Sequence, residues 1–84
     1  MPKRTDYPLQ VACTRQGLPR KLIWPDGRRS ENIAEILDYW REVGAWWDGE
    51  SERQVYLVVT TTQKSYELYQ VLATGSWYLT RVFD

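Results

Sequence analysis

Three tyrosines in the second half of the chain have the residue type and spacing for base stacking. Tyr56, Tyr69 and Tyr78 fall on separate stretches of alternating sequence. If these stretches pair as strands, the rings form a row across one face, on which the bases of a single nucleic-acid strand could stack. Candidate phosphate contacts near the strand ends are Arg53, Lys64 and Arg81. The alternative is a cross-strand aromatic ladder that only stabilises the sheet, and Glu67, expected on the same face, would repel phosphate.

Tryptophan supplies a second kind of candidate site, a protein-binding surface. Trp46 and Trp47 are adjacent, and neighbouring residues of a strand point to opposite faces, so one of the two rings is expected to be exposed. An exposed Trp near Arg41 would suit a binding hot spot, because Trp, Tyr and Arg dominate such sites. The alternative is that a small core needs large rings, and this is the role we expect for Trp40 and Trp77.

The sequence lacks the residues that most enzymes and metal sites use. The chain contains no His, which removes imidazole zinc ligands and His-based acid–base chemistry. Its one cysteine, Cys13, falls on an apolar strand face and is expected to pack there rather than act as a nucleophile. Four carboxylates recur at helical spacing, at Glu31, Glu35, Asp38 and Glu42. Without a His partner, a solvated face explains them better than a metal site, so we expect no enzymatic activity, cofactor or metal.

Length and charge limit the kinds of partner. An 84-residue chain is expected to form one domain with a small core. Lys plus Arg number 11, as do Asp plus Glu, so the net charge is zero. That balance argues against a global electrostatic grip on nucleic acid or an anionic membrane, though not against a local basic patch. A single cysteine fits a reducing compartment, and no apolar run approaches the ~20 residues of a membrane span, so the expected location is the cytoplasm.

Short strands joined by turns account for most of the chain. Apolar and polar residues alternate over residues 9–14, 21–24 and 53–61, which is typical of half-buried strands. Turns are expected at residues 16–17 and 25–27, because Gly accepts the positive φ and Pro presets the first turn position.

The last third of the chain, residues 66–81, is expected to form two strands joined by a turn at Thr74 and Gly75. A tight turn at Thr62 and Gln63 should pair the first of them with the preceding strand. Six residues are then expected to face the core: Val55, Leu57, Val59, Leu68, Leu79 and Phe83.

The same registers predict cross-strand partners. Tyr69 should lie between Tyr56 and Tyr78 on the outer face, and Trp77 should be buried opposite Gln70. A slip by one residue would exchange the two faces, so these pairings are a strict test of the register.

Residues 31–43 fit two secondary structures. Four apolar residues have the spacing of one helical face, namely Ile33, Ile36, Leu37 and Trp40. The turn at residues 25–27, however, should send the chain back along the previous strand. A strand with a β-bulge near Ala34 would also keep Ile33 and Ile36 on one face. The local pattern leaves helix and bulged strand open.

Together these elements predict an all-β fold. Five or six strands with short connections form an antiparallel meander over residues 9–84, which at this size should close into an SH3-like barrel to hide its edges. The alternative is an α+β fold with one helix at 31–43. Residues 1–8 are expected to form a flexible N-terminal arm.

Three segments resemble an uncharacterised family of small bacterial domains. They are Trp40 with Trp46-Trp47, Tyr66-Glu-Leu-Tyr69, and Thr74-Gly-Ser-Trp-Tyr-Leu79 with Arg81 and Asp84. The likeness covers roughly residues 17–84, and the last motif is its most specific part. Where the family more often has a Tyr-x-Val strand pattern, this chain has Glu31-Asn32-Ile33; the resemblance still favours a strand over residues 31–43.

Members of that family are often encoded beside Y-family translesion DNA polymerases, so the resemblance implies an accessory role in DNA damage tolerance. We expect a non-enzymatic binding module that contacts single-stranded DNA weakly, or a polymerase partner, through exposed aromatic rings. The alternative is a domain that acts only through protein–protein contact or homo-oligomerisation. Basic residues gathered around exposed rings would favour the nucleic-acid role.

Overall fold

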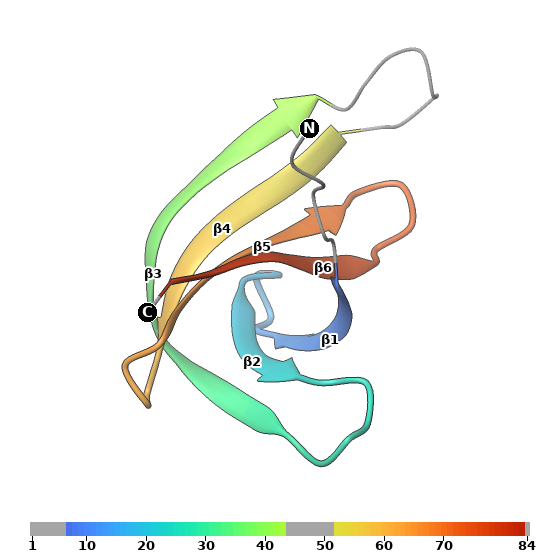
Figure 1. The fold of residues 1–84 in the computed structure, drawn as a ribbon. Helices are drawn as coiled ribbons and strands as arrows, with labels where there is room; N and C mark the ends of the chain where they lie inside the picture. The colour runs from blue at the N-terminus through green and yellow to red at the C-terminus, as the bar shows by residue number, and fades with distance from the viewer. Residues whose placement is uncertain (1–6, 44–51, 84) are drawn as a thin grey trace, which may run out of the picture.

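The structure, a computed structural model, describes residues 7–43 and 52–83 of the chain. These residues form strands β1 (Tyr7–Cys13), β2 (Pro19–Ile23), β3 (Ser30–Val43), β4 (Glu52–Thr60), β5 (Ser65–Val71) and β6 (Trp77–Phe83). Each strand pairs antiparallel with the next, and β1 pairs with β6 to close a six-stranded barrel (Figure 1). The predicted all-β meander that closes into a barrel is therefore confirmed. Nowhere in the described part of the chain is there a helix long and apolar enough to cross a membrane.

Closure depends on the start of β1. Tyr7 lies opposite Leu79, and Leu9 lies opposite Trp77. The first strand therefore includes Tyr7 and Pro8, which we expected in the N-terminal arm, whereas residues 1–6 lie outside the described part of the chain.

The segment that fitted two secondary structures is a strand, so the helix alternative over residues 31–43 is wrong. The register of β3 against β4 shifts at Ala34 and again at Leu37. Each shift inserts one extra residue. The first keeps Ile33 and Ile36 on the inner face three positions apart, which imitates helical spacing, and the second places Tyr39 opposite Tyr56. The bulge at Ala34 was expected; the one at Leu37 was not.

The predicted register of β4 against β5 is wrong by one residue. The connection contains three residues, 61–63, instead of two, and Gln63 adopts a left-handed φ of 65°. Thr60 N–H donates to the Lys64 carbonyl across this turn at 2.8 Å. Tyr56 consequently lies opposite Leu68, and Val58 opposite Tyr66.

The slip exchanges the two faces of β4. Tyr56, Val58 and Thr60 are buried on the inner face, whereas Leu57 and Val59, which we expected in the core, are only half-buried on the outer face. Val55 is buried as expected, but on the outer face opposite Tyr69.

The predicted register of β5 against β6 is confirmed. Tyr69 lies opposite Tyr78 and Gln70 opposite Trp77, and Val71 N–H bonds to the Ser76 carbonyl across the turn. An unexpected bulge at Thr80 reverses the faces beyond it. Phe83, expected in the core, is consequently 40% exposed.

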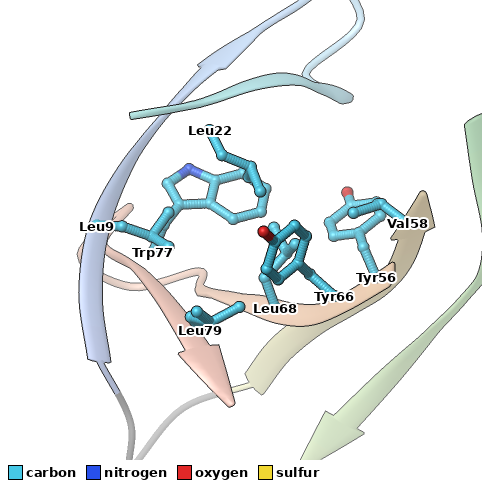
Figure 2. Close-up of a cluster of buried hydrophobic side chains, with 8 residues drawn as sticks. All are labelled: Leu9, Leu22, Tyr56, Val58, Tyr66, Leu68, Trp77 and Leu79. Atoms are coloured by element: carbon cyan, nitrogen blue, oxygen red, sulfur yellow. The ribbon is translucent and has the colours of Figure 1, made fainter. Parts of the chain in front are cut away.

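The core fills the inside of the barrel. Its members are Leu9, Leu22, Tyr56, Val58, Tyr66, Leu68, Trp77 and Leu79 (Figure 2). Trp77 packs against Tyr56 with 5.6 Å between ring centroids, near the middle of the cluster. Each buried side chain of this size stabilises the fold by about 1.5–3 kcal/mol, so the large rings offset the small number of core residues.

Candidate functional site

The expected row of three tyrosines does not form. Tyr56 points into the barrel, where 6% of it is exposed, because the three-residue turn at 61–63 shifts its register. Tyr69 and Tyr78 stack on the outer face with ring centroids 5.3 Å apart. The guanidinium carbon of Arg53 lies 4.8 Å from the centroid of Tyr69. Since Tyr69 is itself buried, these contacts form a ladder that steadies the sheet and offer little ring surface to a base.

The three predicted phosphate contacts are not gathered together. Arg53 lies near the start of β4, opposite Val71. Lys64 follows the turn at the other end of β4, and Arg81 lies on β6 opposite Glu67. The structure therefore places no shared basic patch over the tyrosines.

Of the three predicted protein-binding residues, the structure describes only Arg41. Trp46 and Trp47 lie outside the described residues. Arg41 forms an exposed ion pair with Glu52 at 3.1 Å. Trp40, expected in the core, is half-buried on the outer face opposite Val55, because the bulge at Leu37 shifts its register.

Cys13 and the carboxylates also depart from the expectations. Cys13 is exposed at the end of β1 rather than packed in the core, and partial burial raises the pKa of its thiol. The carboxylates lie along a strand rather than a helix. No group of three potential metal ligands occurs within the ranges that the structure describes.

Glu31 is the exception among the carboxylates, because it is buried. It accepts hydrogen bonds from the hydroxyls of Thr60, Thr62 and Tyr66, and its carboxylate lies 3.6 Å from the Arg29 guanidinium. Burial would raise the pKa of Glu31, but the three hydroxyl donors and the charge of Lys64 outweigh burial and lower it. The cluster joins β3 to β4 and β5, which is a structural role.

An apolar hollow, here called the β3 groove, opens where β3 leaves β2. Strand β2 pairs with β3 only over residues 30–32, and beyond that point β3 bends away and runs with β4 (Figure 1). The β3 groove has a volume of about 480 Å³. Its lining includes Leu18, Ile36, Leu37, Asp38, Tyr39 and Tyr56.

The walls of the β3 groove are exposed, and its floor packs against the core. Leu37 is 49% exposed and Tyr39 66% exposed, and Leu18 of the β1–β2 connection faces them. The Tyr39 ring lies 6.5 Å from Tyr56, which in turn packs on Trp77. A ligand in the groove would therefore rest on rings that continue into the core.

Polar groups at the rim of the β3 groove limit how the edge of β3 can be used. The carboxylate of Asp38 accepts a hydrogen bond from the backbone N–H of Tyr39 at 2.8 Å. This bond, together with the two bulges, protects the edge against indiscriminate strand addition. Asp38, which lines the groove and is exposed, gives the rim an acidic group.

Sequence reasoning missed this groove because it depends on an extra residue. Leu37 occupied a helical face in the local pattern, but it is the unpaired residue of the second bulge and is exposed. The one signal was the pair of large apolar residues, Leu37 and Tyr39, on either side of a charged residue.

The fold defines a small all-β protein, a closed six-stranded antiparallel barrel with exposed grooves. The chain belongs to the family described as the domain of unknown function DUF6504, whose model matches residues 3–84. This agrees with the expected likeness to an uncharacterised family of small domains. No curated protein and no solved structure matches the chain.

Proposed function

We propose that this barrel is a non-enzymatic, cytoplasmic accessory module that binds a protein partner in the β3 groove. The observation that carries the proposal is the exposed apolar wall formed by Leu37 and Tyr39 over a floor continuous with the core. Exposed apolar surface of this kind marks interaction sites on soluble proteins. A volume of about 480 Å³ accommodates one or two large side chains of a partner.

The rim of the β3 groove indicates the chemistry of that partner. Asp38 is exposed beside the apolar wall, so a basic residue of the partner would complement it. The proposed ligand is a protein segment with an aromatic or aliphatic anchor and a flanking Lys or Arg. The family resemblance suggests a Y-family translesion polymerase as the protein that carries it. The burial of Tyr56 and Tyr69 disfavours single-stranded DNA on the tyrosine ladder.

A peptide library tests the groove without presuming the partner. Short random peptides displayed on phage are selected against the wild-type protein and against Leu37→Asp. The wild type should enrich peptides with a large apolar residue next to Lys or Arg, and Leu37→Asp should not. Because Leu37 is an exposed bulge residue, its replacement should leave the free energy of unfolding within about 0.5 kcal/mol. Equal enrichment by both proteins would contradict the proposal.

Calorimetric titration with a Y-family polymerase from the same genome tests the partner. Binding should weaken at least tenfold in Tyr39→Ser and persist in Tyr7→Ser, a matched loss of an exposed tyrosine elsewhere on the barrel. Sedimentation that reports concentration-dependent dimers, abolished by Leu37→Asp, would instead support the homo-oligomer alternative.

A further inference from the structure

A second hollow, here called the β6 groove, lies where the start of β1, β6 and the β2–β3 turn meet. Its volume is about 500 Å³. Its lining includes Tyr7, Trp24, Asp26, Arg29, Thr80 and Arg81. Two guanidinium groups and two aromatic rings thus line one hollow, although the chain as a whole carries no net charge.

Arg29 is held in place by the core. Its guanidinium carbon lies 4.6 Å from the centroid of the Trp24 ring, and its nitrogen lies 3.6 Å from the Glu31 carboxylate. Trp24 in turn meets the buried Tyr66 edge to face, with 5.9 Å between centroids. The side chain of Arg29 nevertheless remains 54% exposed, so a pre-positioned cation faces the groove.

Arg81 contributes the second cation from the opposite wall. It is exposed on β6, and its cross-strand neighbour Glu67 accepts a hydrogen bond from the hydroxyl of Thr80 at 2.9 Å. Within residues 7–43 and 52–83, Arg81 forms no ion pair. Its guanidinium is therefore available to an anion.

The geometry points to the β6 groove as a binding site for a nucleotide unit, with the phosphate held by Arg29 and Arg81 and the base resting on Tyr7. Guanidinium groups match phosphate oxygens through paired N–H donors. Tyr7 is 45% exposed and offers a ring face, and the guanidinium plane stacked on Trp24 is a second surface of the kind bases use. Asp26 accepts a hydrogen bond from the backbone N–H of Arg28 through Oδ1, and its other carboxylate oxygen could accept one from an amino or hydroxyl group of the nucleotide.

This site is independent of the β3 groove and differs from the tyrosine ladder predicted from sequence. Only Arg81 is common to both nucleic-acid hypotheses. Two phosphate contacts give a predicted slope of log affinity against log salt of about −1.4 for a single strand. Binding should therefore be weak, favour single strands over duplex, and weaken moderately with salt.

Fluorescence anisotropy at low and moderate salt tests the inference with three probes: a labelled single-stranded oligonucleotide, the corresponding duplex, and a labelled mononucleotide. The single strand should bind saturably. Arg81→Ala should weaken it on the order of tenfold, because one charge-assisted contact is lost. Tyr7→Ser should weaken it roughly five- to hundredfold. If the mononucleotide binds as tightly as the single-stranded oligonucleotide, the ligand of the groove is a free nucleotide rather than a nucleic-acid strand.

One variant serves as a matched control. Arg15→Ala removes a charge in the β1–β2 connection, at the other end of β2 from Trp24. It should bind like the wild type. The inference is overturned if no probe binds saturably, if the duplex binds as well as the single strand, or if Arg81→Ala and Arg15→Ala weaken binding equally. Because Arg81 is exposed and lies outside the Glu31 cluster, Arg81→Ala should leave the fold intact.

Discussion

The hydroxyl of Tyr66 donates a 2.6 Å hydrogen bond to the buried carboxylate of Glu31. The two residues are 35 positions apart in the chain, and their bond joins β5 to β3 at the point where β3 leaves β2. Because Thr60 and Thr62 donate to the same carboxylate, Glu31 is satisfied although it is almost fully buried.

Glu31→Gln should destabilise the protein by about 1.5–3 kcal/mol at neutral pH, the usual value of hydrogen bonds to a charged group. The folded-state pKa of Glu31 is lowered, so its stabilisation is present above its unfolded pKa, near 4.5, and is lost as the pH falls through the folded value. Urea unfolding of wild type and Glu31→Gln between pH 7 and pH 3 should show the difference shrinking at acid pH. A difference that stays constant with pH would show that the charge contributes nothing.

Tyr66 should impose a second pH dependence at the alkaline end. Burial, and then the hydrogen bond and charge of Glu31, raise its pKa from 10 to about 12. A folded-state pKa above the unfolded one means that this stabilisation is complete below pH 10 and is lost as the pH rises toward 12. Ultraviolet titration of tyrosinate should find a group that titrates near pH 12 and is missing in Tyr66→Phe. If no such group titrates in the wild type, Tyr66 is not held in the buried contact with Glu31.

Trp77→Ala should destabilise the fold by about 3–5 kcal/mol, because it opens a cavity beside Tyr56 and Leu9. In a domain this small, such a loss threatens folding itself. Trp40→Ala is the matched control, since Trp40 is only half-buried on the outer face, and it should cost clearly less. Denaturation midpoints measure both. Equal losses would argue that Trp77 does not fill the centre of the core.

Gln63→Gly should stabilise the protein by about 0.5–1 kcal/mol. Gln63 has a φ of 65°, a left-handed conformation that costs energy in residues with a Cβ and none in glycine. Gln63→Val is the opposing control, because a β-branched side chain is disfavoured there and should lower stability. Thermal unfolding that ranks valine at or above glycine would contradict the three-residue turn and, with it, the observed register of β4 and β5.

Local sequence signals predicted the elements that depend on neighbouring residues. The alternation of β5 and β6 and the turn chemistry at Gly75, whose φ is 76°, gave the correct pairing of Tyr69 with Tyr78 and of Trp77 with Gln70. The bulge at Ala34 was also predictable, because the turn after β2 requires the chain to return along it.

Three single residues that only the tertiary structure placed account for most of the errors. Gln63 extends the β4–β5 turn, Leu37 is inserted in β3 and Thr80 in β6. The first extra residue moves Tyr56 from the expected nucleic-acid face into the core. The second places Tyr39 opposite Tyr56, beside the β3 groove, and turns Trp40 to the outer face.

The physical reason is the period of two along a strand. The sequence by itself predicted the antiparallel meander, its closure and the hairpin that carries Trp77, because alternation and turn residues act locally. Whether residues 31–43 form a strand or a helix was decided only by the tertiary structure. It did not determine where single residues are inserted, because a bulge depends on the hydrogen bonds of the partner strand and on the curvature that closes a barrel. One inserted residue exchanges the two faces of everything beyond it. Whether a ring such as Tyr56 points into the core or toward a ligand was therefore decided only when the strands had paired.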